Sequence, residues 1–197
     1  MEKMNRRQFL ATGAAGVATC AGLVACTTTP ATARSSEENL HARREIDAGV
    51  DGALSRLYGT VKGSRELFSK ARAVLVFPDV IGAGVGVGAQ YGKGALRAGG
   101  RTVGYFSTTA GSLGFQVGAQ SRAIFYAFMT QGSYERFRRS SGWAAGADGT
   151  VALVKMGANG TIDTTTAVNP IEAIVLTNAG LMAGVSLEGS KVSRLDI

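Results

Sequence analysis

The sequence has few of the residues on which catalytic and metal sites depend. Its 197 residues include one histidine and two cysteines. The histidine, His41, falls early in a predicted helix, where we expect it to be exposed rather than to act as a base. Processing of the N-terminus, described below, would leave Cys26 as the one cysteine, which excludes a disulfide and a cysteine-held metal. The sequence therefore predicts a protein that is not an enzyme and that holds no metal or cofactor.

Acidic residues are scarce in the middle of the chain. The sequence carries 21 basic and 14 acidic residues, but Glu135 is the only acid between Val80 and Ser140. The basic residues of this stretch are Lys93, Arg97, Arg101, Arg122, Arg136, Arg138 and Arg139. Such a surplus attracts anions, although it also serves as a solubilising surface. Nucleic acid is not an expected partner, because the basic residues lack interleaved aromatic side chains.

Glycine, in contrast, is abundant, and between Gly82 and Gly94 it stands at nearly every second position. A period of two predicts a strand with one apolar face and one bare face. A phosphate-binding loop is excluded, since Val87 and Gly94 stand where it needs glycine and serine or threonine. The bare face predicts either close packing within the protein or a groove for a lipid tail, with Arg97 or Arg122 near the headgroup.

The first 25 residues have the order of a signal peptide: a basic start, a short apolar stretch and a small-residue end. Asn5–Leu10 resembles the twin-arginine export motif. Leu23–Cys26 resembles a bacterial lipobox, so we expect Cys26 to be lipidated and to become the new N-terminus. A plain secretory signal with an incidental cysteine is the alternative.

Residues 26–36 predict a flexible tether, because they are mostly threonine, serine and alanine. Residues 37–197 then have a length that suits one domain. Thr27, and not aspartate, follows the cysteine. By the sorting pattern of Gram-negative bacteria, this predicts a lipid-anchored protein of the cell envelope, in the outer membrane.

Two helices are predicted before the strands begin. Apolar residues recur at three- and four-residue spacing from Glu37 to Gly59, with Ser36 as a cap. Ser64–Lys70 predicts a short second helix. The apolar run at 73–78 then predicts a buried strand that ends at Pro78.

The rest of the chain predicts strands near 83–91, 94–98, 102–108, 113–119, 122–129, 150–156, 161–166, 171–177 and 183–188. Gly99–Gly100 and 158–160 are typical of hairpin turns. The strand at 122–129 is apolar on both faces and should be central, and a short helix near 133–139 has Ser133 as its expected cap. The fold class is therefore α+β: N-terminal amphipathic helices followed by an antiparallel β-rich body, a sandwich or barrel-like.

Nine short motifs, in consistent order from about Leu54 to the C-terminus, resemble the SYLF domain family. They are VLVFP at 74–78, GVGVGAQYG at 84–92, YFS at 105–107, GFQVGAQ at 114–120, FMT at 128–130, SSGW at 140–143, DTTT at 163–166, GLM at 180–182 and SLEG at 186–189. The resemblance implies binding of membrane phospholipids, with phosphoinositides favoured by eukaryotic members and actin bound by a yeast branch.

The resemblance also implies lipid contact through an amphipathic N-terminal segment with basic residues. Here that segment offers Leu67 and Phe68, and the candidate lipid-binding residues are Lys62, Arg65, Lys70, Arg72, Arg97 and Arg122. We therefore expect a non-enzymatic, membrane-anchored lipoprotein that binds phospholipid or another anionic amphiphile. The alternative is a structural or protein-interaction module of the envelope that holds a protein partner.

Overall fold

The computed structural model describes residues 35–114, 120–154, 161–162, 169–182 and 186–197, without the side chains of 83–87, 112–114 and 120. These residues belong to one compact unit. The predicted signal peptide, the lipidation site Cys26 and most of the predicted tether lie outside the described residues. So do the predicted turn at 158–160 and parts of the strands predicted at 113–119, 150–156, 161–166 and 183–188. Within the described part of the chain, no helix is long and apolar enough to cross a membrane.

Helix α1 (Ser36–Thr60) begins with a reciprocal cap. Glu38 N donates to Ser35 Oγ at 3.2 Å, and Ser35 N donates to Glu38 Oε2 at 3.0 Å. The predicted helix is confirmed, but its capping residue is Ser35 and not Ser36. One stripe of the helix is buried against the sheet, made by Ile46, Val50, Ala53 and Leu57.

Strand β1 (Ala73–Ala98) follows the short helix α2 (Ser64–Lys70), whose predicted bounds are confirmed. With 26 residues, β1 replaces three predicted strands. The prediction that the strand ends at Pro78 is wrong, because the pairing register shifts between Phe77 and Val80. The shift leaves the proline, which has no N–H to donate, outside the ladder.

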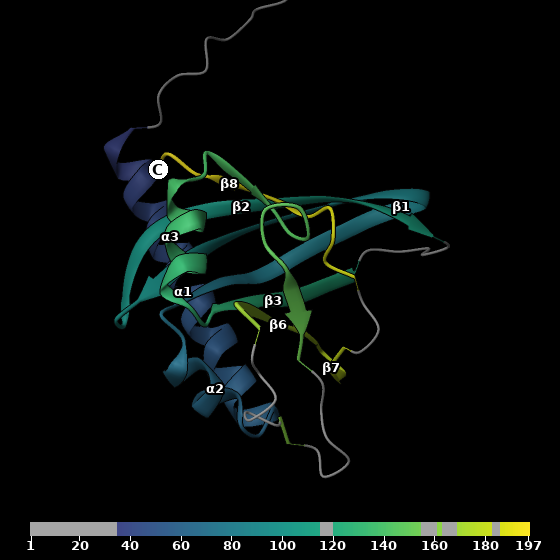
Figure 1. Ribbon diagram of the computed structural model, residues 1–197. Coiled ribbons are helices and arrows are strands. Elements are labelled where there is room, and N and C mark those ends of the chain that lie inside the picture. Colours follow the sequence, from purple (N-terminus) through teal and green to yellow (C-terminus); the bar gives the residue numbers. More distant parts are fainter. Residues whose placement is uncertain (1–34, 115–119, 155–160, 163–168, 183–185) are drawn as a thin grey trace, which may run out of the picture. The chain divides into compact units, whose positions relative to one another are not determined.

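The strands form one curled sheet of eight, in the order β4–β8–β2–β1–β3–β6–β5, with β7 paired to β6 (Figure 1). Their bounds are β2 Arg101–Gly114, β3 Gln120–Phe128, β4 Gly142–Ala144, β5 Val151–Leu153, β6 Ile171–Thr177, β7 Gly180–Leu181 and β8 Lys191–Arg194. The α+β class and the β-rich body are confirmed. The purely antiparallel arrangement is not, because β5 and β6 pair in parallel. The connection from Leu153 to Ile171 is long enough for the crossover that such a pair requires.

Two details near the C-terminal half also differ from the sequence-based expectation. Residues 186–188, the described end of the strand predicted at 183–188, form no strand, and β8 lies just beyond them between β2 and β4. Helix α3 (Gln131–Arg139) is capped by Thr130, whose hydroxyl accepts from Ser133 N at 3.2 Å. Ser133, the predicted cap, is instead buried in the first turn, where it donates to Pro170 O at 2.9 Å.

Helices cover the sheet on both faces, and each face has its own core (Figure 1). Strand β3 supplies both, because its side chains alternate: Ala123, Phe125 and Ala127 face α1 and α2, whereas Ile124, Tyr126 and Phe128 face α3. This confirms that the apolar strand is central, between β1 and β6. We call the two sides of the sheet the α1–α2 face and the α3 face.

Two glycines of the bare face of β1, Gly92 and Gly94, are covered by the strand itself. Residues 73–82 pair with β3 and residues 86–98 pair with β2, so the strand has two arms. Gly94 and Val76 would be about 60 Å apart in a straight strand, yet a Cβ on Gly94 would lie 2.0 Å from Val76 O. A Cβ on Gly92 would lie 2.8 Å from Asp79 O. At these two positions the glycines allow close packing between the arms and leave no space for a lipid tail.

Candidate functional site

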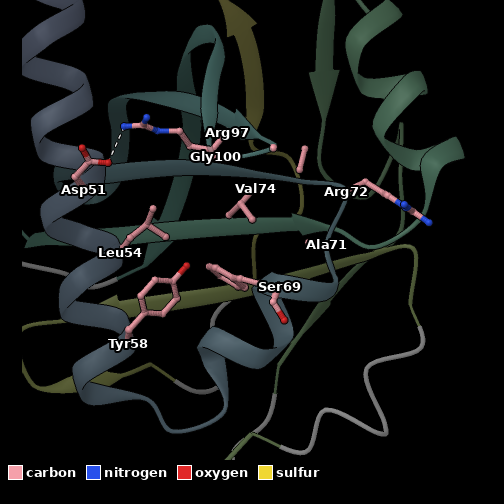
Figure 2. Close-up of a pocket in the computed structure, with 12 residues that line it drawn as sticks. Asp51, Leu54, Tyr58, Ser69, Ala71, Arg72, Val74, Arg97 and Gly100 are labelled. Atoms are coloured by element: carbon pink, nitrogen blue, oxygen red, sulfur yellow. Dashed lines mark hydrogen bonds and ion pairs between the residues drawn. The ribbon is translucent and has the colours of Figure 1, made fainter.

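A cavity of about 360 Å³ opens on the α1–α2 face, where α1, α2, the start of β1 and the β1–β2 turn meet (Figure 2). We call it the helical cavity. Its apolar wall comes from Leu54, Tyr58, Phe68, Ala71, Ala73 and Val74. Its polar lining comes from Asp51, Ser69, Arg72, Arg97 and the turn Gly99–Gly100. The site thus combines an apolar wall with a charged end, as small-ligand sites in proteins commonly do.

Local sequence explains the apolar wall. Leu54 and Tyr58 are four residues apart on α1, so both side chains point to the same side of the helix (Figure 2). The rings of Phe68 of α2 and Tyr58 are T-shaped to each other, with 6.2 Å between ring centroids. The Arg65 guanidinium lies over that ring at 4.4 Å. Burial raises the pKa of the Tyr58 hydroxyl, and the nearby Arg65 opposes this rise, so the hydroxyl is a neutral hydrogen-bonding group at physiological pH.

The charged end is built around Arg97, whose side chain is only 19% exposed. Its Nη2 lies 2.7 Å from Asp51 Oδ1 and 3.4 Å from Asp47 Oδ1. The Nε atom is buried and has no hydrogen-bond partner among the described residues. The turn at Gly99 and Gly100, with φ of 57° and 76°, directly follows β1 and confirms the predicted hairpin.

Asp47 joins this end of the cavity to the hairpin beneath α1. Thr102 Oγ1 donates to its Oδ1 at 2.7 Å, and Tyr105 Oη donates to its Oδ2 at 2.8 Å. Burial and the bond to Asp47 raise the pKa of the Tyr105 hydroxyl. Asp47 therefore fixes the position of α1 over the β1–β2 hairpin and, through Arg97, the shape of the cavity.

The structure brings only some of the predicted lipid-binding residues together. Arg72 and Arg97 line the helical cavity, but the Arg72 side chain extends away from it (Figure 2). Arg65 does not line the cavity, but its guanidinium lies over the ring of Tyr58, which does. Lys70 is exposed and forms an ion pair with Glu66 at 2.8 Å, and Lys62 is exposed after the end of α1.

Arg122 lies apart from these residues, on β3. It donates to Gln90 Oε1 of the second β1 arm, and desolvation lowers its pKa. It does not line the helical cavity. The predicted set of six cations is therefore not one cluster.

The two apolar side chains of the segment that was expected to contact lipid are buried. Leu67 is 0% exposed and Phe68 is 6% exposed, because both belong to the core between α2 and the sheet. The segment exposes its cations, whereas of these two apolar side chains only Phe68 borders the helical cavity.

Asp47, Asp51 and Tyr58 were missing from the predicted site. Their spacing on one helix was the available signal, since Asp47, Asp51, Leu54 and Tyr58 recur at three and four residues. His41 is exposed on α1, as predicted. Within the described ranges, no group of three or more His, Cys, Asp or Glu residues could hold a metal ion.

Comparison with protein families matches residues 109–196 to the Ysc84 family, described as a Las17-binding protein actin regulator. This match supports the predicted SYLF family for residues 109–196. The family is associated with lipid and actin binding. No curated protein matches the chain.

The SYLF match and the helical cavity occupy different parts of the chain. All lining residues of the cavity lie between Asp51 and Gly100, before the first matched residue. The matched part nevertheless supports the cavity from the sheet, because Phe125 of β3 packs on Phe68 with 6.1 Å between ring centroids. The SYLF strands thus form the base on which α2 rests.

Proposed function

We propose that this protein is a non-enzymatic lipoprotein, anchored in the bacterial envelope through Cys26, that binds phospholipid in the helical cavity. The observation that carries the proposal is the composition of that cavity. It places the Arg97 guanidinium at one end of an apolar wall that includes Leu54 and Val74. A phospholipid has the matching order of groups, a phosphate next to an apolar body. The lipid association of the SYLF family supports the same function.

The volume of the cavity limits what enters it. About 360 Å³ corresponds to roughly a dozen water molecules in the liquid. That space suits a headgroup with the adjoining glycerol rather than two acyl chains. In this proposal, the acyl chains stay in the bilayer and the exposed Arg65, Lys70 and Arg72 face the membrane surface, where each basic residue contributes about 1 kcal/mol. The outer membrane is the proposed location.

Filling the cavity tests this function. Ala71 lines the cavity in extended backbone, so Ala71→Phe would place a ring in the space without helix strain. The full chain, with Cys26→Ser to prevent lipidation, would be floated with phospholipid vesicles. We expect Ala71→Phe to weaken binding by at least about fivefold. The matched control is Ala48→Phe, an exposed position of α1 outside the cavity, which should bind like the parent.

A folded Ala71→Phe variant that binds vesicles as the parent does would exclude the cavity as the lipid site. Folding is judged by far-ultraviolet circular dichroism and by the thermal midpoint. If both Ala71→Phe and Ala48→Phe lost vesicle binding, the loss would come from adding a large side chain and not from filling the cavity.

A second candidate function is a protein-interaction module of the envelope. Three exposed apolar side chains of β1 and β2 favour it: Ile81 at 56%, Tyr91 at 48% and Val103 at 43% exposed. The description of the matched family, a Las17-binding protein, also refers to binding of a protein. This function would be supported by an envelope protein that the full chain retains without vesicles and that Ile81→Ser releases.

A further inference from the structure

The charges at the polar end of the helical cavity are balanced, and this bears on which headgroup fits. Arg97 has two carboxylates within 4 Å, those of Asp51 and Asp47. The second cation that lines the cavity, Arg72, directs its side chain away (Figure 2). A headgroup with only negative charge would meet Asp51 as well as Arg97 and would be repelled by it.

The two partners of the 2.7 Å ion pair differ in what they offer a ligand. The Arg97 side chain is 19% exposed, and its buried Nε has no hydrogen-bond partner among the described residues. The Asp51 side chain is 68% exposed, and its bond to Arg97 uses only Oδ1. The ion pairs with Asp47 and Asp51 hold the Arg97 guanidinium in place, and its Nη N–H groups, not the buried Nε, are the donors for an anionic oxygen. Asp51 is an accessible acceptor for a cationic N–H group.

We infer that the helical cavity selects a zwitterionic phospholipid headgroup with a primary ammonium, of the phosphoethanolamine type, over a net anionic headgroup. The phosphate is bound by Arg97 and the ammonium by Asp51. Such a ligand satisfies both side chains at once, whereas an anionic headgroup satisfies one and opposes the other. This inference rests on the proposed function and specifies its ligand. It also differs from the expectation, drawn from the basic residues, of an anionic amphiphile.

The test compares two vesicle compositions with the full Cys26→Ser chain. Both have a phosphatidylcholine base, one with added phosphatidylethanolamine and one with added phosphatidylglycerol. The measured quantity is the ratio of the two dissociation constants at about 1 M salt, where the Debye length is about 3 Å. The salt screens the attraction of the exposed Arg65, Lys70 and Arg72 to the anionic phosphatidylglycerol surface, and the ratio cancels contacts that do not depend on the headgroup. We expect a ratio of about fivefold in favour of ethanolamine, because Asp51 is largely exposed and exposed charge pairs are weak.

Asp51→Asn is the decisive variant, since it keeps the size of the side chain and removes its charge. It should reduce the ratio to about one, chiefly by strengthening binding to the phosphatidylglycerol vesicles. The matched control is Glu45→Gln, which removes an exposed carboxylate of the same helix that does not line the cavity. That variant should retain the ratio of the parent chain.

Two results would overturn the inference while leaving lipid binding intact. One is parent binding that is equal for the two vesicles or stronger with phosphatidylglycerol. The other is an Asp51→Asn variant whose ratio equals that of the parent. Absence of binding to every vesicle is a different outcome, because it would remove the proposed function itself.

Discussion

The two faces of the sheet are packed in different ways, and the difference explains where a ligand site can form. On the α3 face, aromatic rings fill the space: Phe137 lies 5.0 Å from Phe106, 4.9 Å from Phe128 and 5.7 Å from Trp143, between centroids. On the α1–α2 face, the sheet presents Ala95, Ala123 and Ala127. Two separate helices cover this face, and the helical cavity opens where they meet the start of β1 and the β1–β2 turn.

The largest expected loss of stability comes from removing an aromatic ring from the α3 face, which tests whether the two faces differ in packing. Trp143 is 2% exposed and contacts three other aromatic rings. Trp143→Ala should lower the free energy of unfolding by about 3–5 kcal/mol, because a closely packed site collapses only in part around the void. Urea unfolding followed by circular dichroism measures this.

The control for Trp143→Ala is Leu54→Ala, on the wall of the helical cavity. Leu54 already borders open space, so its truncation should cost about 1 kcal/mol. Equal losses for the two variants would show that the faces do not differ in packing.

The second-largest expected loss of stability comes from adding one methyl group between the two arms of β1. Gly94→Ala would place a Cβ 2.0 Å from Val76 O and 2.7 Å from the Phe77 ring, so the two arms of β1 must separate. We expect a loss of about 3 kcal/mol in the free energy of unfolding. Gly52→Ala, on α1 with nothing within 4 Å of the added Cβ, should instead stabilise by about 0.5–1 kcal/mol. A thermal midpoint unchanged in Gly94→Ala would contradict the close packing of the arms.

Both comparisons bear on how much of this molecule the sequence can predict. Helices α1 and α2 were placed to within a residue at each end, because caps and apolar spacing are local signals. The central position of β3 followed from its apolar run, and the Gly99–Gly100 turn followed from its composition. Each of these features is determined by a few residues that are close together in the sequence.

The helical cavity was not predicted, because its charged end depends on contacts distant in the sequence. Asp47 lies 55 residues from Thr102 and 58 from Tyr105, and no local pattern marks such a pairing. The continuity of β1 through Pro78 was missed for a similar reason, since it depends on a register shift against β3. Counting basic residues predicted a cationic site, but folding places two carboxylates beside Arg97.

A smaller loss of stability is expected when the hydrogen bonds that Asp47 of α1 accepts from the hairpin are weakened. These polar contacts hold α1 to the sheet, whereas aromatic rings fill the α3 face. Asp47→Asn removes the charge that accepts hydrogen bonds from Thr102 and Tyr105. We expect a loss of about 1–2 kcal/mol in the free energy of unfolding. Asp51→Asn, which changes an exposed side chain, should cost less than about 0.5 kcal/mol. Equal losses in urea unfolding would mean that Asp47 does not hold the helix.

The smallest expected change in stability at neutral pH concerns Tyr126 on the α3 face, whose side chain is fully buried. Its hydroxyl makes no hydrogen bond within the described part of the chain, although Ser190 lies nearby, and burial raises its pKa well above the usual 10. The neutral hydroxyl is thus favoured in the folded state. Its contribution is complete below pH 10 and is lost as the pH rises further, because the unfolded chain then ionises first.

Tyr126→Phe should therefore change the free energy of unfolding little at pH 7, since no hydrogen bond is removed. Above pH 10 the parent should lose stability more steeply with pH than the variant does. Arg122 and Ser190 are the polar groups that act on this hydroxyl, and both remain in the variant. Parallel curves of stability against pH for the two proteins would show that the hydroxyl reaches water. The α3 face would then be less tightly closed than its rings indicate, and the contrast with the helical cavity would be correspondingly weaker.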